Sequence, residues 1–232
     1  MTNSYKKSYS NEGSDLLVLE LLRNIKGKKS YIDIGGNHPK IQNETYLFYK
    51  KGWSGLIIEP QIKFNKLYKK YRKKDKIYNG IVAQQKKNYK FYEFSNNRMS
   101  TSNNFQLKKN LSFHDRKIIS SFDVQSNSLL DILQHFKIDH KNIKYICIDV
   151  EGSEYQTLSG INFEFIRPEL INIEIKNLGF NDLMNNKIVK KLKELNYYIL
   201  SKNHLNCFFI NKQSSYFDFF PKKFLNKIFN EN

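Results

Sequence analysis

Short apolar runs alternate with amphipathic segments along most of the chain, a pattern typical of strands alternating with helices. Buried strands are expected where apolar residues run without interruption. The strongest of these runs are KKSYIDIGG, GLIIEP, IKYICIDV and LINIEI. Helices are expected where apolar residues recur at helical spacing, at residues 15–24, 47–51, 62–74, 128–136, 153–158 and 182–195. This order predicts an α/β fold with a parallel sheet covered by helices on both faces.

Weaker patterns complete the sheet. A short strand is expected at 76–82, and strands at 197–200 and 207–211 flank the turn KNHLN, which predicts an antiparallel pair. The segment 84–122 is polar and reads as irregular, apart from a strand at 89–94. We therefore expect a mixed sheet of about seven strands with an antiparallel edge.

Composition is consistent with a folded domain. Of the 232 residues 40% are hydrophobic and 15% aromatic, enough to build a core despite a net charge of +17. Cys147 and Cys207 lie far apart, which excludes a disulfide scaffold or a zinc ribbon and favours a reducing compartment. The N-terminal MTNSYKKSYSNEGSD lacks the apolar region of a signal peptide, so a cytoplasmic protein is expected.

One large domain is expected at residues 28–212, preceded by a helical segment at 1–27 and followed by a basic amphipathic tail at 213–232. On a helix, the apolar residues of the tail would share one face: Phe224, Leu225, Ile228 and Phe229. The favoured interpretation is that this face packs against the domain. A weak peripheral contact with an anionic membrane is the alternative.

Acidic residues stand where the strong strands end. Asp33, Glu59, Asp149 with Glu151, and Glu174 each lie at or near such an end. Ligands of open α/β sheets bind beyond the carboxyl ends of the strands. Because close carboxylates repel one another, their gathering on one rim indicates a functional site.

The local motifs narrow the ligand. The loop Asp33-Ile34-Gly35-Gly36-Asn37 lacks both the third glycine of a dinucleotide fingerprint and the GK[ST] of a P-loop, which argues against NAD and nucleoside triphosphates. Glu59, at the end of the next strand, is placed to accept hydrogen bonds from both hydroxyls of a ribose. Asp149 and Glu151 either face a substrate or share a divalent cation. The structural alternative is that they, together with Glu154, favour the start of a helix near Ser153.

The strings NEGSDLLVLELL, YIDIGGNHP, TYLFYKKGWSGLIIEP, IDVEGSEYQTLSG and RPELINIEI together resemble the FkbM-type family of S-adenosylmethionine-dependent methyltransferases. The resemblance covers roughly residues 10–211. It implies the class I methyltransferase fold, a Rossmann-like mixed sheet of seven strands, and S-adenosylmethionine as the cofactor.

The resemblance also implies roles for single residues. The implied sites are Asp33, Gly35, Gly36 and Asn37 around the methionine part of the cofactor, Glu59 at its ribose, Gly13 and Asp15 in a leading segment that closes over the cofactor, and Asp149 and Glu151 as the catalytic acids. Two positions depart from the family pattern. Gly36 replaces the usual alanine, a sterically permissive change, and Cys147 stands where a lysine is frequent.

The resulting hypothesis is a methyltransferase that uses S-adenosylmethionine to O-methylate a sugar, a glycan or a related small metabolite. A metal-free base is favoured over a divalent cation held by Asp149, Glu151 and Glu174. The alternatives are a nucleic-acid methyltransferase, suggested by the charge of +17, and a non-catalytic binding module. No basic block interleaved with aromatic residues supports nucleic acid, and compositional drift also explains the charge.

Overall fold

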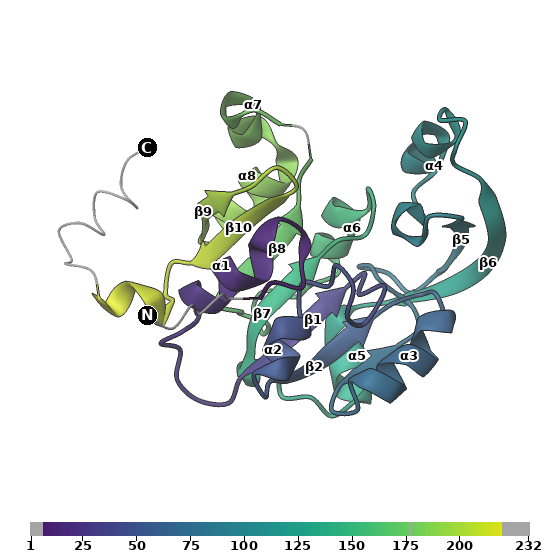
Figure 1. The fold of residues 1–232 in the computed structure, drawn as a ribbon. Coiled ribbons are helices and arrows are strands. Elements are labelled where there is room, and N and C mark those ends of the chain that lie inside the picture. Colours follow the sequence, from purple (N-terminus) through teal and green to yellow (C-terminus); the bar gives the residue numbers. More distant parts are fainter. Residues whose placement is uncertain (1–6, 177, 220–232) are drawn as a thin grey trace, which may run out of the picture.

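The computed structural model describes residues 7–176 and 178–219, which build around a seven-stranded mixed sheet (Figure 1). The strands follow one another across the sheet in the order β3-β2-β1-β7-β8-β10-β9. Their bounds are β1 (Ser30–Ile34), β2 (Ser54–Ile58), β3 (Lys76–Tyr78), β7 (Ile143–Ile148), β8 (Leu170–Glu174), β9 (Tyr197–Lys202) and β10 (Asn206–Asn211). The strands β3, β2, β1, β7 and β8 are parallel, and β10 runs antiparallel to both β8 and β9. The predicted mixed sheet with an antiparallel edge is confirmed.

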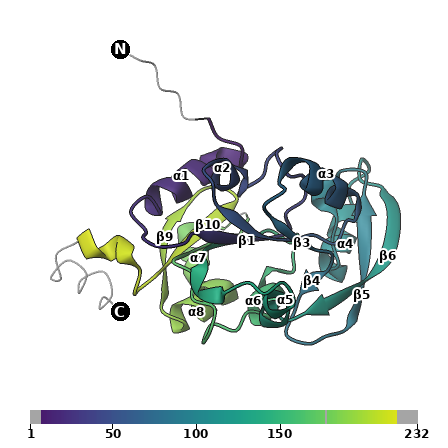
Figure 2. The same cartoon turned by 90° about the horizontal axis from the view of Figure 1, so that it is seen from below.

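Helices cover both faces of this sheet (Figure 2). One face carries α1 (Ser14–Leu21), α2 (Tyr46–Lys50) and α3 (Lys63–Tyr71), and the other carries α5 (Leu129–His135), α6 (Glu154–Ser159) and α8 (Lys187–Glu194). Every residue of β1, β8 and β10 is buried, which explains why their apolar runs are continuous. Burial of apolar side chains on both faces is the main force that holds the strands in place.

The segment 84–122 was expected to be irregular apart from one strand, and that expectation was wrong. Residues 88–127, called the arm below, form regular elements over most of their length. The arm contains β5 (Asn88–Phe94), a short 3-10 turn (Asn97–Met99), α4 (Asn104–Leu111) and β6 (Ile118–Asn127). It stands to one side of the main sheet (Figure 1). The expected strand at 76–82 also divides, because β4 (Ile81–Val82) leaves the main sheet and pairs with β6.

Other predicted elements need smaller corrections. The helix expected at 182–195 is two helices, α7 (Phe180–Asn185) and α8, because Asn186 is extended and its side chain accepts a hydrogen bond from the Ile188 N–H. Short 3-10 turns also occur at Asn11–Gly13, His140–Asn142 and Ser215–Phe219. The apolar face expected at 224–229 lies outside the described residues. Within the described ranges, none of the helices combines the length and the apolar character needed to cross a bilayer.

Candidate active site

The carboxyl ends of β1, β2, β7 and β8 border a cavity of about 690 Å³. All the acids that the sequence singled out at the strand ends line it: Asp33, Glu59, Asp149, Glu151 and Glu174. Gly35, Gly36 and Asn37 line it as well. The structure thus brings residues from 33 to 174 in the sequence to one rim, as the parallel sheet predicts.

The turn after β1 is too tight for any side chain at its first glycine. Gly35 has φ +89°, and its N–H donates to the Ile58 carbonyl oxygen (2.8 Å). A Cβ at this position would lie 1.7 Å from the Asp149 carbonyl oxygen. The Asp149 N–H in turn donates to the Ile34 carbonyl oxygen (2.9 Å), so the ends of β1 and β7 are locked together.

Gly35→Ala is therefore expected to destabilise the protein strongly. Gly27→Ala is the matched control, because Gly27 has φ +82° and an added Cβ there meets nothing within 4 Å. The left-handed backbone alone should cost the control variant roughly 1 kcal/mol of unfolding free energy. Urea unfolding should show at least about twice that loss for Gly35→Ala, since overpacking is added to the strain. Equal losses in the two variants would contradict the clash.

Gly36 makes room for a tyrosine. A Cβ there would approach Ile57 Cγ2 to 2.6 Å and Tyr68 Oη to 2.7 Å. The Tyr68 hydroxyl uses this space to donate to the Gly36 carbonyl oxygen (2.7 Å). The glycine that replaces the usual alanine is thus matched by its neighbours, and an alanine here would require one of them to move.

Asp33 is held at the cavity by two polar side chains, Asn43 and Thr45. Its Oδ2 accepts hydrogen bonds from Thr45 Oγ1 (2.6 Å) and Asn43 Nδ2 (3.2 Å), and its side chain is buried. Burial raises the pKa of Asp33, and the nearby Arg72 guanidinium opposes that rise. The orientation of the carboxylate is therefore fixed before any ligand arrives.

Glu59 lies buried at the end of β2 beside the glycine turn. The N–H of Asn37 donates to its Oε2 (2.7 Å) and the N–H of Gln61 to its Oε1 (2.8 Å). Burial raises the pKa of Glu59 to about 7, although both backbone donors favour the charged form. Each carboxylate oxygen keeps a further acceptor position. Gln61 Oε1, also buried at the cavity, has no hydrogen-bond partner among the described residues.

A lysine that the sequence analysis overlooked sits among the catalytic candidates. Lys176 Nζ lies 2.8 Å from Glu174 Oε1 and 3.1 Å from Glu151 Oε2. Cys147, where the resemblance implied a frequent lysine, is buried, and burial keeps the pKa of its thiol well above the usual value. The ammonium group that pairs with the candidate acids comes instead from Lys176, just after β8.

Asp149 is the least satisfied acid of this cluster. Its Oδ1 is buried and accepts no hydrogen bond from the described residues. Burial raises the pKa of Asp149 to about 8, and the charge of Glu151 adds to the rise. Burial likewise raises the pKa of Glu174 to about 10, with Asp149 as the next cause. A carboxylate with a free, desolvated oxygen is suited to accept a proton near neutral pH.

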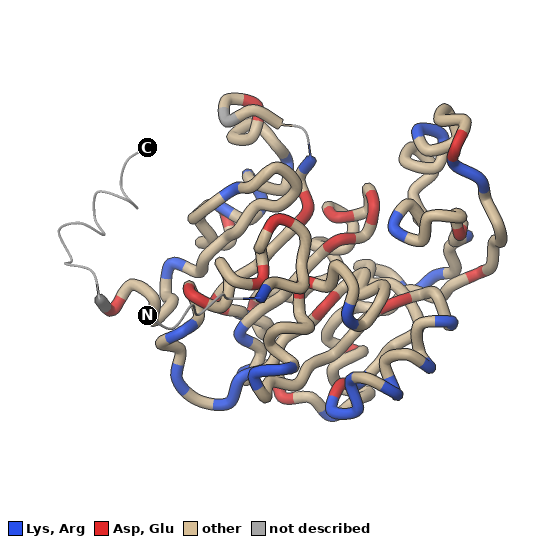
Figure 3. Tube along the Cα trace, viewed as in Figure 1, with Lys and Arg blue, Asp and Glu red and all other residues tan. Residues whose placement is uncertain are grey.

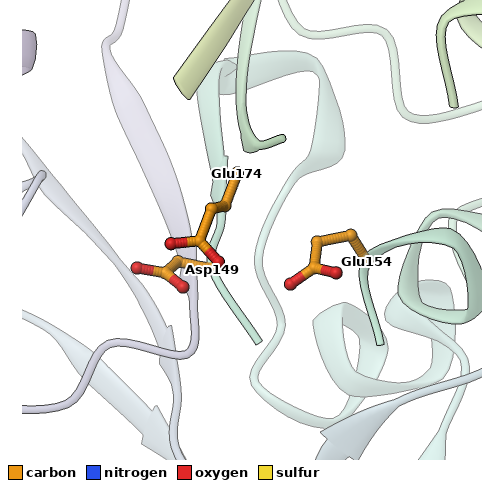
Figure 4. Close-up of side chains that lie close together, drawn as sticks. All are labelled: Asp149, Glu154 and Glu174. Atoms are coloured by element: carbon orange, nitrogen blue, oxygen red, sulfur yellow. The ribbon is translucent and has the colours of Figure 1, made fainter. Parts of the chain in front are cut away.

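A candidate cation site differs by one residue from the predicted set. Oxygen atoms of Asp149, Glu154 and Glu174 lie within 4.8 Å of one another, and their carboxylates face a common space (Figure 4). Glu151 is paired with Lys176 instead. Glu154 opens α6, and its carboxylate accepts a hydrogen bond from the Gly152 N–H (2.9 Å). The sequence indicated only that it favours the helix start. Carboxylate oxygens suit a hard divalent cation such as magnesium or manganese.

The leading segment does not bring its predicted residues to the cavity. Asp15 is fully buried and accepts hydrogen bonds from Ser8 Oγ (2.6 Å) and the Tyr9 N–H (2.7 Å) of its own loop. Gly13 stands at the start of α1 with φ +70°. Neither lines the cavity, whereas Asn11 does. In this structure Asp15 shapes the loop, and a role over the cofactor for Gly13 and Asp15 stays a prediction.

Several cavity residues carried no sequence signal. Glu44 lies at the cavity, and burial raises its pKa well above the usual value, with Asp149 and Asp33 adding to the rise. From the arm come Arg98, Lys109 and Arg116. The acids cluster near the strand ends while many lysines lie on outer helices such as α3 (Figure 3). The cavity is thus rich in carboxylates within a chain of net charge +17.

A comparison with curated proteins gives no match. The profile of the Methyltransferase FkbM domain matches residues 33–199, which run from the end of β1 into β9. This range contains the glycine turn, Glu59 and the Asp149 cluster, and the seven-stranded sheet is the Rossmann-like one that the resemblance implied. The chain therefore belongs to the FkbM methyltransferase family.

Proposed function

We propose that this methyltransferase transfers the methyl group of S-adenosylmethionine to a hydroxyl oxygen of a sugar, a glycan or a related small metabolite. The observation that carries the proposal is Asp149 Oδ1, a buried acceptor atom without a partner among the described residues, at a carboxylate-lined cavity. It is the feature expected of a general base that awaits a hydroxyl.

The residues present fit this cofactor. S-adenosylmethionine supplies a methyl group already activated on a positively charged sulfonium. Asp33 and Glu44 line the cavity, and a cation bound beside these two carboxyl groups would favour their ionised forms and be attracted by them. Glu59 would accept hydrogen bonds from the ribose hydroxyls, and the unpartnered Gln61 Oε1 offers another acceptor beside it.

On the acceptor side, Asp149 would remove the proton of the reacting hydroxyl. Lys176 holds Glu151 and Glu174 through its ion pairs, and it thereby fixes the two carboxylates that flank Asp149. Holding the hydroxyl against the methyl donor converts a bimolecular encounter into a positioned one, which supplies much of the acceleration. The metal-free route stays our preference, because the Lys176 ammonium already neutralises part of this acidic cluster.

The test has a binding arm and a transfer arm. Calorimetry should show that S-adenosylmethionine and S-adenosylhomocysteine bind and that NAD does not. Label from methyl-labelled S-adenosylmethionine should then appear on a sugar hydroxyl, with chelator present or absent. Stabilisation by NAD alone would refute the cofactor. Transfer that stops with chelator and returns with manganese would replace the metal-free route by a cation at Asp149, Glu154 and Glu174.

Glu59→Ala is expected to weaken binding of S-adenosylhomocysteine by roughly 30-fold or more, because two hydrogen bonds to a charged carboxylate are lost. The control variant Glu164→Gln changes an exposed residue outside the cavity lining and should bind like the wild type. Calorimetry on both variants checks this. Unchanged affinity in a folded Glu59→Ala protein would refute the ribose assignment.

The same carboxylate predicts a pH dependence. Ribose hydroxyls donate best to ionised Glu59, whose pKa is raised to about 7 in the free protein. Affinity for S-adenosylhomocysteine should therefore rise as the pH passes through about 7 and level off above it. Stability runs the other way: the proton that burial favours on Glu59 contributes stability below about pH 4.5, and this contribution is lost as the pH rises to about 7. Glu59→Gln should remove this part of the pH dependence.

A further inference from the structure

The arm contributes a group of basic side chains to the cavity. Arg98, Lys109 and Arg116 all line it. Across residues 7–176 and 178–219, none of these three has a carboxylate oxygen within 4 Å, whereas Lys176 has two. Positive charge is therefore available on the arm side of the cavity, while the strand-end side is anionic.

Arg116 is held in place by uncharged neighbours. Its Nη1 donates to Asn110 Oδ1 (2.9 Å), and its guanidinium carbon lies 4.0 Å from the centre of the Phe113 ring. Asn110 is fully buried and is itself anchored to the Met99 carbonyl oxygen (2.8 Å). The Nε and Nη2 groups of Arg116 have no acceptor in the described part of the chain. The guanidinium is thus oriented in advance, with donors to spare for a ligand.

The arm is hydrogen-bonded directly to the loop that follows β7. Thr101 Oγ1 donates to the Glu151 carbonyl oxygen (2.8 Å), and Asn103 Nδ2 donates to the Gly152 carbonyl oxygen (2.7 Å). Arg116, Asp149 and Glu151 line the same cavity, so an acceptor molecule bound there can contact the guanidinium and the candidate catalytic acids together.

We propose that Arg116, together with Lys109 and Arg98, binds a carboxylate or phosphate group of the acceptor, so that the substrate class is an anionic sugar. The planar fork of a guanidinium matches either group with paired hydrogen bonds. Tyr89 and Phe91 also line the cavity and offer apolar surface to a sugar ring. The methylation of this sugar rests on the function proposed above, whereas its binding does not.

Calorimetry tests the binding directly with three probes: methyl glucuronide, glucose 6-phosphate and neutral methyl glucoside. The wild type should bind one or both charged sugars at least about tenfold more tightly than the neutral one. Arg116→Gln should remove that preference. Lys117→Gln is the matched control, since Lys117 is an adjacent exposed cation outside the cavity lining, and it should retain the preference. Equal binding of all three sugars by the wild type, or an unchanged preference in Arg116→Gln, would overturn the proposal.

Other readouts separate this proposal from the proposed function. If S-adenosylhomocysteine does not bind but the charged-sugar preference depends on Arg116, the anion site stands and the methyltransferase cofactor fails. If the cofactor binds and neutral sugars are methylated as efficiently as charged ones, the proposed cofactor stands and the anion site fails. In the transfer assay Arg116→Gln should raise KM for the charged sugar about tenfold or more and leave kcat within about threefold.

A nucleic-acid ligand is the other outcome to test. Tight binding of single-stranded RNA with a steep salt dependence, lost in Arg116→Gln, would overturn the anionic sugar in favour of a nucleic acid.

Discussion

Asp149→Asn should lower methyl transfer by on the order of 100-fold or more while cofactor affinity changes little, because the amide cannot take the proton of the hydroxyl. The side chain keeps its size and lies in a site where Oδ1 has no partner among the described residues, so the fold has no contact to lose there. Single-turnover rates with labelled S-adenosylmethionine measure the effect. Asp123→Asn, which removes an exposed carboxylate from the arm, should leave the rate unchanged.

The stability of the Asp149→Asn variant sharpens this test. Burial raises the pKa of Asp149 from 3.8 to about 8, so the folded state holds this proton more tightly than the unfolded state. The stability that the protonated form contributes is present below about pH 4 and is lost as the pH rises to about 8. The asparagine variant should therefore be no less stable than the wild type at pH 8, even though it is inactive. Thermal unfolding at pH 5 and pH 8 checks this, and wild-type turnover should rise with pH through about 8.

Two outcomes would remove Asp149 from the mechanism. One is full activity in a folded asparagine variant, and the other is a loss of activity that merely follows a loss of melting temperature. Glu151→Gln distinguishes a base from a charge effect. It removes the neighbouring charge that adds most to the raised pKa of Asp149, so it should shift the pH profile to lower pH more than it lowers the maximum rate.

The main sheet could be predicted from sequence because its strands are apolar at consecutive positions. β7 and β8 are buried at nearly every residue, and such runs have few other interpretations. β6 was not predicted because most of its residues are exposed and it has no continuous apolar pattern. Its pairing with β5 is what makes it a strand. α4 escaped for a similar reason, since only Asn110 among its residues is buried.

The site divides in the same way. Acids that directly follow strong strands, such as Asp33, Glu59 and Asp149, could be placed on one rim from the order of the strands alone. Lys176 and Arg116 could not, because their importance depends on distances between segments far apart in the chain. Glu154 was visible only as the first residue of a helix. The order of the strands predicts which strand ends meet at the rim. Which side chains pair there, and so which carboxylate is left free, can be read only from the structure.

The second large effect, a loss of stability, is expected at Arg72, which does not line the cavity. Arg72 is fully buried on the α2–α3 side of the sheet, and its Nε lies 2.7 Å from Asp75 Oδ2. Its guanidinium also donates to Asn43 Oδ1 (2.8 Å), Tyr31 Oη (2.9 Å), Thr45 Oγ1 (2.8 Å) and, at longer range, the Pro39 carbonyl oxygen (3.4 Å). Thr45 and Asn43 are the same residues that hold Asp33 at the cavity. The network thus connects a buried ion pair to Asp33, at the end of β1 beside the glycine turn.

Arg72→Met should lower the free energy of unfolding by about 3–5 kcal/mol, because Asp75 is left as an uncompensated buried charge. Urea unfolding measures the loss, and Arg23→Gln, which breaks the exposed pair with Glu20, should change stability little. Arg72→Met combined with Asp75→Asn should recover part of the loss, since the orphaned charge is then absent. A near-neutral Arg72→Met variant would show that the pair does not hold this face together. If the double variant binds S-adenosylhomocysteine more weakly under conditions in which all of the protein is folded, the network also orients Asp33, because its supports Thr45 and Asn43 have lost their common donor.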